Sequence, residues 1–192
     1  MKCMDAAPSD EALIASYARG DMASFEALYR RHELRVWRYL ERNVRNRATA
    51  DELMQEVWFA VARHAARYEP RARFTTWLFT IAHNRMVEAM RLQRRQISLD
   101  AIGYESPAVH EVLTAETRAG PAAAAVAGDE AAALHRALQD LPPEQREAFL
   151  LQVEGELGVQ EIAAVTRSTF ETTKSSLRYA RSKLLELLKD YA

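Results

Sequence analysis

Three cationic side chains recur along one side of a helix predicted near the C-terminus. Lys174, Arg178 and Arg181 are spaced at i, i+4 and i+7, and Ser175 and Ser176 follow directly after Lys174. Cations and hydroxyls on a helix can meet the phosphates and base edges of a DNA major groove. The same stripe also fits a solvated face that suits the negative end of the helix dipole. For an isolated helix the solvated face is the more common case. The residues that precede the helix therefore decide between DNA binding and a solvated face.

Those residues are typical of a helix-turn-helix. A short apolar helix ends near Val165, polar residues 166–169 provide turn and cap chemistry, and a longer helix begins near Phe170. The longer helix has an apolar stripe that would pack inward, formed by Leu177, Ala180, Leu184 and Leu187. The short helix and the turn shift the prediction towards DNA binding.

The charge is distributed unevenly, although the net charge is only −1. Residues 1–96 hold 17 Lys and Arg against 12 Asp and Glu, whereas residues 97–130 hold one Arg against six carboxylates. In residues 131–192 the positive charge gathers on the last helix. The local charges therefore say more about partners than the global isoelectric point does.

Apolar residues follow helical spacing almost throughout, and signals for strands are nearly absent. We expect an all-α fold of two small helical domains joined by a flexible linker, the second containing the helix-turn-helix. The first domain would span residues 1–96, the linker residues 97–128 and the second domain residues 129–192. The linker is acidic, Ala-rich and interrupted by Gly and Pro, with at most a transient helix near residues 109–118.

Local signals predict the helix boundaries. In the first domain the helices span residues 10–19, 21–46, 49–68 and about 75–95, and a capping box of Thr49 and Glu52 opens the third. In the second domain an Ala-rich helix covers residues 129–140, and Pro143 begins the next helix, where its missing N–H costs nothing.

Catalysis is the least expected function. The five histidines are scattered without a zinc-binding spacing, and the sequence has no Gly-rich phosphate loop or nucleophile elbow. The single cysteine, Cys3, cannot form a disulfide within the chain or a site of four thiolates. We expect no enzyme activity, no metal and no cofactor.

The hydropathy pattern predicts a cytoplasmic protein without membrane insertion. The N-terminal residues lack an apolar signal core, and no stretch approaches about 18 consecutive apolar residues.

Four segments in a fixed order resemble those of one protein family. Residues 51–58, DELMQEVW, are similar to an EDLxQExF segment of region 2.2, and residues 74–84, FTTWLFTIAHN, to an FxxWLxxIAxN segment. The basic residues 91–95 and the TxKSxLxxAxxxL-like residues 172–184 complete the set. With these segments the chain resembles an extracytoplasmic-function (group 4) sigma factor of the sigma-70 family of bacterial RNA polymerase.

The resemblance covers almost the whole chain and implies a function. Such a factor directs core RNA polymerase to specific promoters and assists promoter melting in transcription initiation. Residues 1–96 would be sigma region 2, and residues 129–192 sigma region 4. The partners would be promoter DNA and core polymerase, whose largest-subunit clamp coiled coil would contact region 2 and whose flap region would contact region 4.

The helix predicted from residue 49 would dock on the clamp coiled coil. The resemblance assigns polymerase binding to Asp51, Glu52, Gln55, Glu56 and Trp58. The carboxylates of this helix can pair with basic residues of the polymerase, while its apolar side would hold it to the hydrophobic core of the domain through Leu53, Val57 and Val61. An acidic first turn that merely suits the helix dipole is the alternative.

The stretch from residue 71 to residue 95 would handle the minus ten element. Opening a duplex requires cations for the freed backbone and a pocket for an extruded base. The resemblance assigns this element to Arg71, Arg73, Asn84, Arg85, Glu88, Arg91, Arg94 and Arg95. It also places the loop for the flipped base after the 74–84 segment, at about residues 88–96.

The final helix would recognise the minus thirty-five element. The matched family positions and the cationic stripe are Thr172, Thr173, Lys174, Ser175, Arg178, Tyr179 and Arg181, with the two threonines near backbone phosphate. The chain departs from the family where Thr166 and Arg167 replace a common Leu-Gly turn and where Ser176 replaces a common cation. The lost turn glycine predicts a different turn geometry.

Thr49 leaves two forms of regulation open. Some subgroups of the family carry a threonine near region 2.2 and are switched by a Ser/Thr kinase instead of an anti-sigma factor. A phosphate on Thr49 would be favourable at a helix N-terminus and would add negative charge beside Asp51. A plain capping threonine is the simpler interpretation.

The main alternative function is a helix-turn-helix regulator that binds duplex DNA without being a polymerase subunit. Such a regulator would bind DNA as an isolated chain and would usually carry a dimerisation helix. A helical adaptor that binds only protein would leave the cationic helix unexplained.

Overall fold

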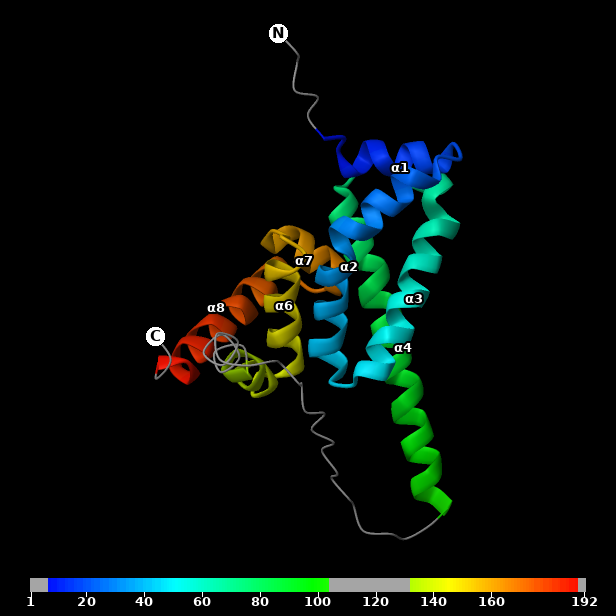
Figure 1. Ribbon diagram of the computed structural model, residues 1–192. Helices are drawn as coiled ribbons and strands as arrows, with labels where there is room; N and C mark the ends of the chain where they lie inside the picture. The colour runs from blue at the N-terminus through cyan, green and yellow to red at the C-terminus, as the bar shows by residue number, and fades with distance from the viewer. Residues whose placement is uncertain (1–6, 104–131, 190–192) are drawn as a thin grey trace, which may run out of the picture.

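The computed structural model describes residues 7–103 and 132–189, and every secondary-structure element within these two ranges is a helix (Figure 1). The N-terminal unit contains α1 (Asp10–Ala18), α2 (Met22–Val44), α3 (Arg47–His64), the 3-10 helix η1 (Ala65–Arg67) and α4 (Phe74–Gly103). The C-terminal unit contains the helical residues 132–139, α6 (Pro143–Val153), α7 (Val159–Thr166) and α8 (Phe170–Leu187). The predicted all-α fold class is confirmed.

The N-terminal unit is held together by the apolar sides of its long helices. α3 packs against both α2 and α4, and α1 lies across one end of the bundle (Figure 1). α2 buries residues three and four apart, among them Leu28, Val36 and Tyr39. Asp21 caps this helix, because its carboxylate accepts hydrogen bonds from the Ala23 N–H at 3.1 Å and the Ser24 hydroxyl at 2.6 Å.

The C-terminal unit contains the predicted helix-turn-helix. α7 ends at Thr166, and Arg167, which follows it, has a φ of 55° and a ψ of 37° in the left-handed region. Thr169 caps α8 by accepting a hydrogen bond from the Thr172 N–H at 3.1 Å. The inner side of α8 packs on α6 and α7, with Leu177, Ala180 and Leu184 buried as predicted.

Two helix boundaries differ from the prediction. α3 begins at Arg47, and its cap is Asn46, whose side chain accepts a hydrogen bond from the Thr49 N–H at 3.0 Å. Thr49 is therefore not the cap, and it forms no capping box with Glu52. α4 runs unbroken to Gly103, so residues 88–96 form a helix and not a loop, and the helix extends into the predicted linker. The predicted linker residues 104–128 lie outside the described ranges.

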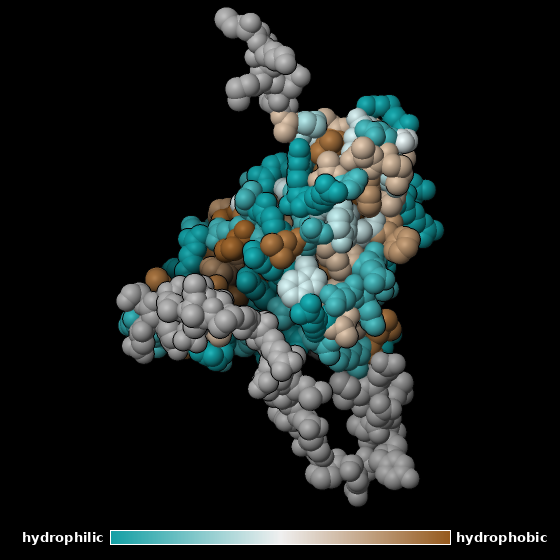
Figure 2. Space-filling model, viewed as in Figure 1, coloured by the Kyte–Doolittle hydropathy of each residue, from teal (hydrophilic) through white to brown (hydrophobic). Residues whose placement is uncertain are grey.

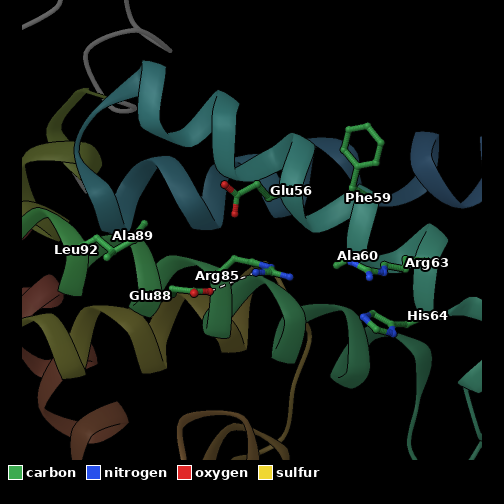
Figure 3. Close-up of a pocket in the computed structure, with 9 residues that line it drawn as sticks. All are labelled: Glu56, Phe59, Ala60, Arg63, His64, Arg85, Glu88, Ala89 and Leu92. Carbon is green, nitrogen blue, oxygen red and sulfur yellow. Dashed lines mark hydrogen bonds and ion pairs between the residues drawn. The ribbon is translucent and has the colours of Figure 1, made fainter.

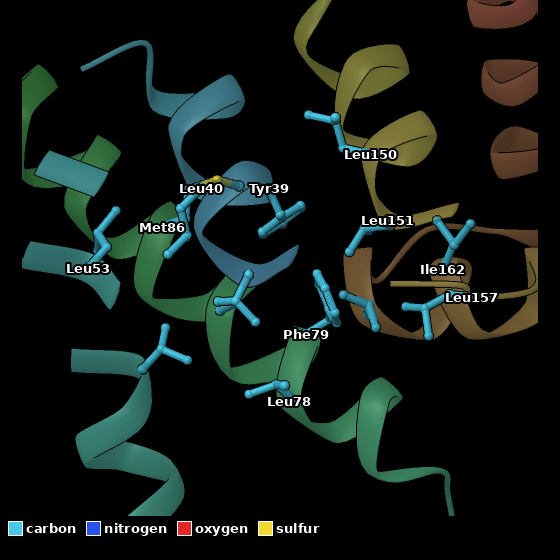
Figure 4. Packing of buried hydrophobic residues seen from close by; sticks show 14 of the residues in the cluster. Tyr39, Leu40, Leu53, Leu78, Phe79, Met86, Leu150, Leu151, Leu157 and Ile162 are labelled. Atoms are coloured by element: carbon cyan, nitrogen blue, oxygen red, sulfur yellow. The ribbon is translucent and has the colours of Figure 1, made fainter. Parts of the chain in front are cut away.

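The two units pack directly on each other. α2 contacts α6, and α4 contacts α7. The rings of Tyr39 and Phe79 meet edge to face with centroids 5.4 Å apart, and Leu151, Leu157 and Ile162 belong to the same buried cluster (Figure 4). One apolar core therefore extends through both units.

The visible surface of the described residues is mostly hydrophilic, with small separate apolar patches (Figure 2). No helix in the described ranges is both long enough and apolar enough to span a bilayer.

Candidate protein and nucleic-acid interfaces

The exposed side of α3 carries most of the residues predicted to bind polymerase. Glu52, Gln55 and Glu56 are exposed on it. Asp51, at the start of the helix, accepts a hydrogen bond from Trp37 Nε1 at 2.7 Å, which ties it to α2. The opposite side holds α3 to the core, as predicted, through Leu53, Val57 and Val61.

Trp58 does not lie on this exposed side. Only 5% of the residue is accessible, and its ring packs against Phe25 and Tyr29 with centroid distances of 5.7 and 5.0 Å. It follows the buried Met54 by four residues, so the helical period carries it into the core. The assignment of Trp58 to polymerase binding is therefore corrected, because its ring is an interior group.

Phe59, which the sequence analysis did not single out, is exposed instead. It is 73% accessible and follows Gln55 by four residues and Glu56 by three. Beside it lies a groove of about 550 Å³ between α3 and α4, with Arg63 and Arg85 among its lining residues (Figure 3). Glu52, Gln55, Glu56 and Phe59 are called the docking face below. A central aromatic ring with polar neighbours is typical of a protein-binding surface. The sequence signal that could have identified Phe59 is its spacing of four residues from Gln55, which places both on one side of the helix.

Most of the predicted minus ten residues gather on α4. Asn84, Glu88, Arg91 and Arg95 are exposed and recur at i, i+4, i+7 and i+11, so they form one stripe, called the α4 stripe below. Arg85 lies beside this stripe and pairs with Glu88 at 3.2 Å (Figure 3). The side chain of Arg94 lies outside the described part of the structure.

Two predicted minus ten cations lie ahead of α4. Arg71, between η1 and α4, is exposed and pairs with Glu69 at 2.7 Å. Arg73 contacts the C-terminal unit: its guanidinium donates to the Glu156 carbonyl at 3.0 Å and pairs with the Glu161 carboxylate at 3.5 Å. The Thr76 hydroxyl donates to the same carboxylate at 2.6 Å. The structure thus separates Arg73 from the α4 stripe.

Glu161 is an ionised partner for Arg73 near neutral pH. Burial raises the pKa of Glu161, but hydrogen bonds from the Thr76 hydroxyl and the Gly158 N–H, together with the charge of Arg73, outweigh burial. The net effect brings the pKa below its ordinary value.

The outer side of α8 presents the predicted cations. Lys174, Arg178 and Arg181 are exposed. The Lys174 ammonium lies 6.0 Å from the centroid of the Phe170 ring, and the Arg178 guanidinium 5.0 Å from that of Tyr179. Arg181 donates a hydrogen bond to Gln152 at 2.6 Å, so α6 restrains it.

The two threonines predicted near phosphate occupy different environments. Thr172 is exposed, and its hydroxyl lies 2.8 Å from that of Thr169. Thr173 is only 3% accessible and precedes the buried Leu177 by four residues. The assignment of Thr173 to phosphate contact is therefore corrected, since its hydroxyl faces the interior. Ser175 is half-buried.

Known proteins match both units. The family models "Sigma-70 region 2" and "Sigma-70, region 4" match residues 28–96 and 131–184. RNA polymerase sigma factor CarQ of Myxococcus xanthus is 37% identical over 174 residues, which cover 88% of this chain and 91% of CarQ. ECF RNA polymerase sigma factor SigE of Mycolicibacterium smegmatis is 32% identical over 197 residues, which cover 96% of this chain and 71% of SigE. The chain belongs to the extracytoplasmic-function sigma factors of the sigma-70 family.

This membership confirms the family predicted from the sequence. A sigma factor directs core RNA polymerase to promoters and takes part in transcription initiation. A DNA-binding regulator that is not a polymerase subunit is not favoured, because the matches cover region 2 as well as the helix-turn-helix of region 4.

Two solved structures have the same fold as this sigma factor. CnrH in complex with the cytosolic domain of CnrY superposes with a TM-score of 0.65 at 21% identity, covering 96% of this chain and all of that one. RpoE in complex with the anti-sigma factor NepR from Bartonella quintana gives 0.66 at 24% identity, covering 88% of this chain and 98% of that one. At these identities the likeness extends to the fold alone.

Proposed function

We propose that the two units of this sigma factor divide promoter recognition between them. Residues 1–96 act as region 2, which docks on core polymerase and recognises and melts the minus ten element. Residues 129–192 act as region 4, which recognises the minus thirty-five element, and residues 97–128 join the two. The observation that carries this proposal is the presence of three separate exposed helix faces: the docking face on α3, the α4 stripe and the cations of α8.

The docking face is suited to a basic helical partner, such as the clamp coiled coil proposed for it. It combines the carboxylates of Glu52 and Glu56 with the exposed ring of Phe59, so it offers charge complementarity and an apolar anchor. The double variant E52K/E56K should lose co-purification with core polymerase, whereas its melting temperature should stay unchanged because both side chains are exposed. Glu26, exposed on α2, provides the control: E26K should bind core normally. Normal binding by E52K/E56K would contradict the docking assignment.

The α8 cations are suited to promoter phosphates and base edges. Each phosphate contact steepens the dependence of log K on log salt by about 0.9. For holoenzyme on a promoter duplex, K174A/R178A should therefore flatten this slope by about 1 to 2. Lys183 lies on the opposite side of α8 and pairs with Glu186 at 3.2 Å, so K183A should leave the slope unchanged. Equal slopes for K174A/R178A and the wild type would remove α8 from the DNA interface.

We propose a cytoplasmic, non-catalytic role without metal or cofactor, in which the polymerase performs the chemistry. The factor RpoE of Bartonella quintana binds an anti-sigma factor, and a protein of this kind is the regulator proposed here. Phosphorylation of Thr49 is the alternative. Thr49 is half-buried in the first turn of α3, beside Asp51, so a phosphate there would change the charge next to the docking face. Intact-mass analysis of the protein from its native cell tests the phosphorylation route, because a phosphate group on Thr49 adds about 80 Da to the chain.

A further inference from the structure

α8 begins with an exposed aromatic side chain, that of Phe170. The residue is 45% accessible and directly follows the capping residue Thr169. Within the described ranges Phe170 is not part of the apolar core, to which α8 contributes Leu177, Ala180 and Leu184. A single exposed apolar side chain is ordinary at a protein surface, so the meaning of Phe170 depends on its surroundings.

The turn between α7 and α8 holds the first turn of α8 in a fixed place. The Ser168 N–H donates a hydrogen bond to the Ala163 carbonyl of α7 at 2.9 Å. On the other side of the turn, the Thr169 hydroxyl accepts a hydrogen bond from the Thr172 N–H at 3.1 Å. Because both sides of the turn are hydrogen-bonded, the backbone of Phe170 needs little reordering to meet a partner, which favours binding.

Phe170 begins an exposed row that continues with two cations of α8. Phe170, Lys174 and Arg178 are spaced by four residues, and all three are exposed. The Lys174 ammonium lies 6.0 Å from the centroid of the Phe170 ring. Along the helix axis the two residues are about 6 Å apart, which is about two base-pair steps of about 3.4 Å. A stretch of groove that takes the Lys174 ammonium is therefore also within reach of the ring.

The place of Phe170 in the helix-turn-helix is the one that meets bases. In this motif the second helix lies in the major groove, and residues at its N-terminal end contact the base edges. Phe170 is the first residue of that helix, and its neighbours Glu171 and Thr172 are also exposed. The ring thus lies where direct readout takes place.

A phenyl ring is suited to one feature of the base edges in the major groove. The ring has no hydrogen-bond donor or acceptor, whereas most groups on these edges are donors or acceptors. The apolar group among them is the C5-methyl of thymine, and phenylalanine is one of the side chains that contact it. Against a polar edge the ring would displace water without replacing its hydrogen bonds, which is costly. The ring should therefore favour thymine over cytosine, whose C5 carries no methyl group.

We propose that Phe170 is a specificity-determining residue of region 4, which packs against the 5-methyl group of a thymine in the minus thirty-five element. This inference rests on the proposed placement of α8 on that element. The cations of α8 supply affinity through phosphates, and Phe170 adds a preference among base pairs.

Selection of promoter duplexes by the holoenzyme identifies the thymine. Two libraries are randomised through both promoter elements, one made with thymine and the other with uracil, which lacks only the methyl group. From the thymine library the wild type should enrich thymine at one minus thirty-five position where F170A shows no preference. From the uracil library the wild type should show no preference for uracil at that position. Leu185, an exposed apolar residue near the other end of α8, provides the matched control: L185A should enrich the same bases as the wild type. Equal base preferences of F170A and the wild type at every position would overturn the proposal.

Affinities on the best selected duplex isolate the methyl group. Replacing that one thymine by uracil should weaken binding by the wild-type holoenzyme about fourfold, the equivalent of about 0.8 kcal/mol for one buried methyl-sized group. In F170A the same replacement should change the affinity by less than about 1.5-fold. Where cytosine occupies this position, 5-methylcytosine should bind the wild type more tightly than cytosine does, because it restores the methyl group. The comparisons with the wild type alone do not depend on how well F170A folds. The same uracil penalty in F170A and the wild type, or no penalty in the wild type, would overturn the contact.

The salt dependence separates a failure of this inference from a failure of the proposed function. F170A removes no charge, so its slope of log K against log salt should equal that of the wild type. If K174A/R178A flattens the slope but F170A keeps the preference for the methyl group, the role of Phe170 alone is overturned. If K174A/R178A leaves the slope unchanged, α8 does not lie on the DNA, and the proposed function of region 4 is overturned as well.

Discussion

Arg167 provides a direct test of the turn between α7 and α8. It holds a left-handed backbone, with φ of 55°, at the position after α7. That conformation costs an L-residue about 1 kcal/mol or more, and glycine adopts it without this cost. Glycine also gains freedom in the unfolded chain, which offsets roughly 0.5 kcal/mol. Arg167→Gly should therefore stabilise the protein by about 0.5 to 1 kcal/mol.

Arg45 supplies the matched comparison. Arg45 follows α2 and has a φ of 58°, so replacement by glycine removes the same backbone strain. Its guanidinium, however, donates a hydrogen bond to the Gln139 carbonyl of the C-terminal unit, and Arg45→Gly removes this bond. A hydrogen bond of this kind contributes about 1.5 kcal/mol or more, so R45G should be neutral or destabilising.

Denaturant unfolding of the full chain, followed by circular dichroism, measures both changes. The midpoint of R167G should move to higher denaturant with an unchanged m-value, and that of R45G should not. A lower stability for R167G, or the same gain in both variants, would refute the reasoning from backbone conformation.

Two further predictions concern α3 and α1. Trp58→Ala should lower the free energy of unfolding by about 3 to 5 kcal/mol, measured by denaturant unfolding, because it leaves a cavity in the core. Phe59→Ala should change the stability by less than about 0.5 kcal/mol but weaken core polymerase binding roughly tenfold. The reverse pattern would contradict the assignment of the docking face. The hydrogen bond from His32 lowers the pKa of Asp10, with burial opposing it. A lowered folded-state pKa stabilises the fold above the unfolded value, near about 4, and this stabilisation is lost as the pH falls through the folded-state value. The difference in unfolding free energy between the wild type and Asp10→Asn should therefore shrink as the pH falls below about 4, and a difference that persists unchanged to about pH 2 would contradict it.

Local signals were sufficient for most helices. Pro143 in the first turn of α6 and the polar residues before α8 act within one turn of the chain, so the sequence reveals them directly. The predicted start of α3 at Thr49 was wrong, because Asn46, three residues earlier, also favours the cap position. The structure uses Asn46, and its oxygen satisfies the Thr49 N–H.

The two misplaced site residues share one cause. Trp58 and Thr173 were assigned by their positions in family segments, although the helical period of each segment places them inside. Trp58 follows Met54 by four residues, and Thr173 precedes Leu177 by four. Periodicity would have predicted both burials, and it would also have placed Phe59 outside.

The contacts between the units could not be predicted from the sequence. Arg42 and Glu154 are separated by 112 residues. A charged side chain is most often solvated, so nothing local distinguishes these arginines from their neighbours on α2. Only the packing of α2 on α6 brings them together.

Two ion pairs between the units, Arg35 with Glu156 and Arg42 with Glu154, each at 2.8 Å, lie in different environments. The Glu156 carboxylate is 69% exposed, and an exposed pair contributes at most about 1 kcal/mol. Loss of this pair in E156Q should therefore lower the free energy of unfolding by no more than about 1 kcal/mol. The Glu154 carboxylate is only 7% exposed, and burial raises its pKa while Arg42, Arg38 and Arg35 offset part of that effect. Because desolvation of Glu154 opposes its attraction to these arginines, its pair adds less than its distance suggests. Neither pair is therefore a large source of stability, and the apolar core shared by the two units contributes most of the contact between them.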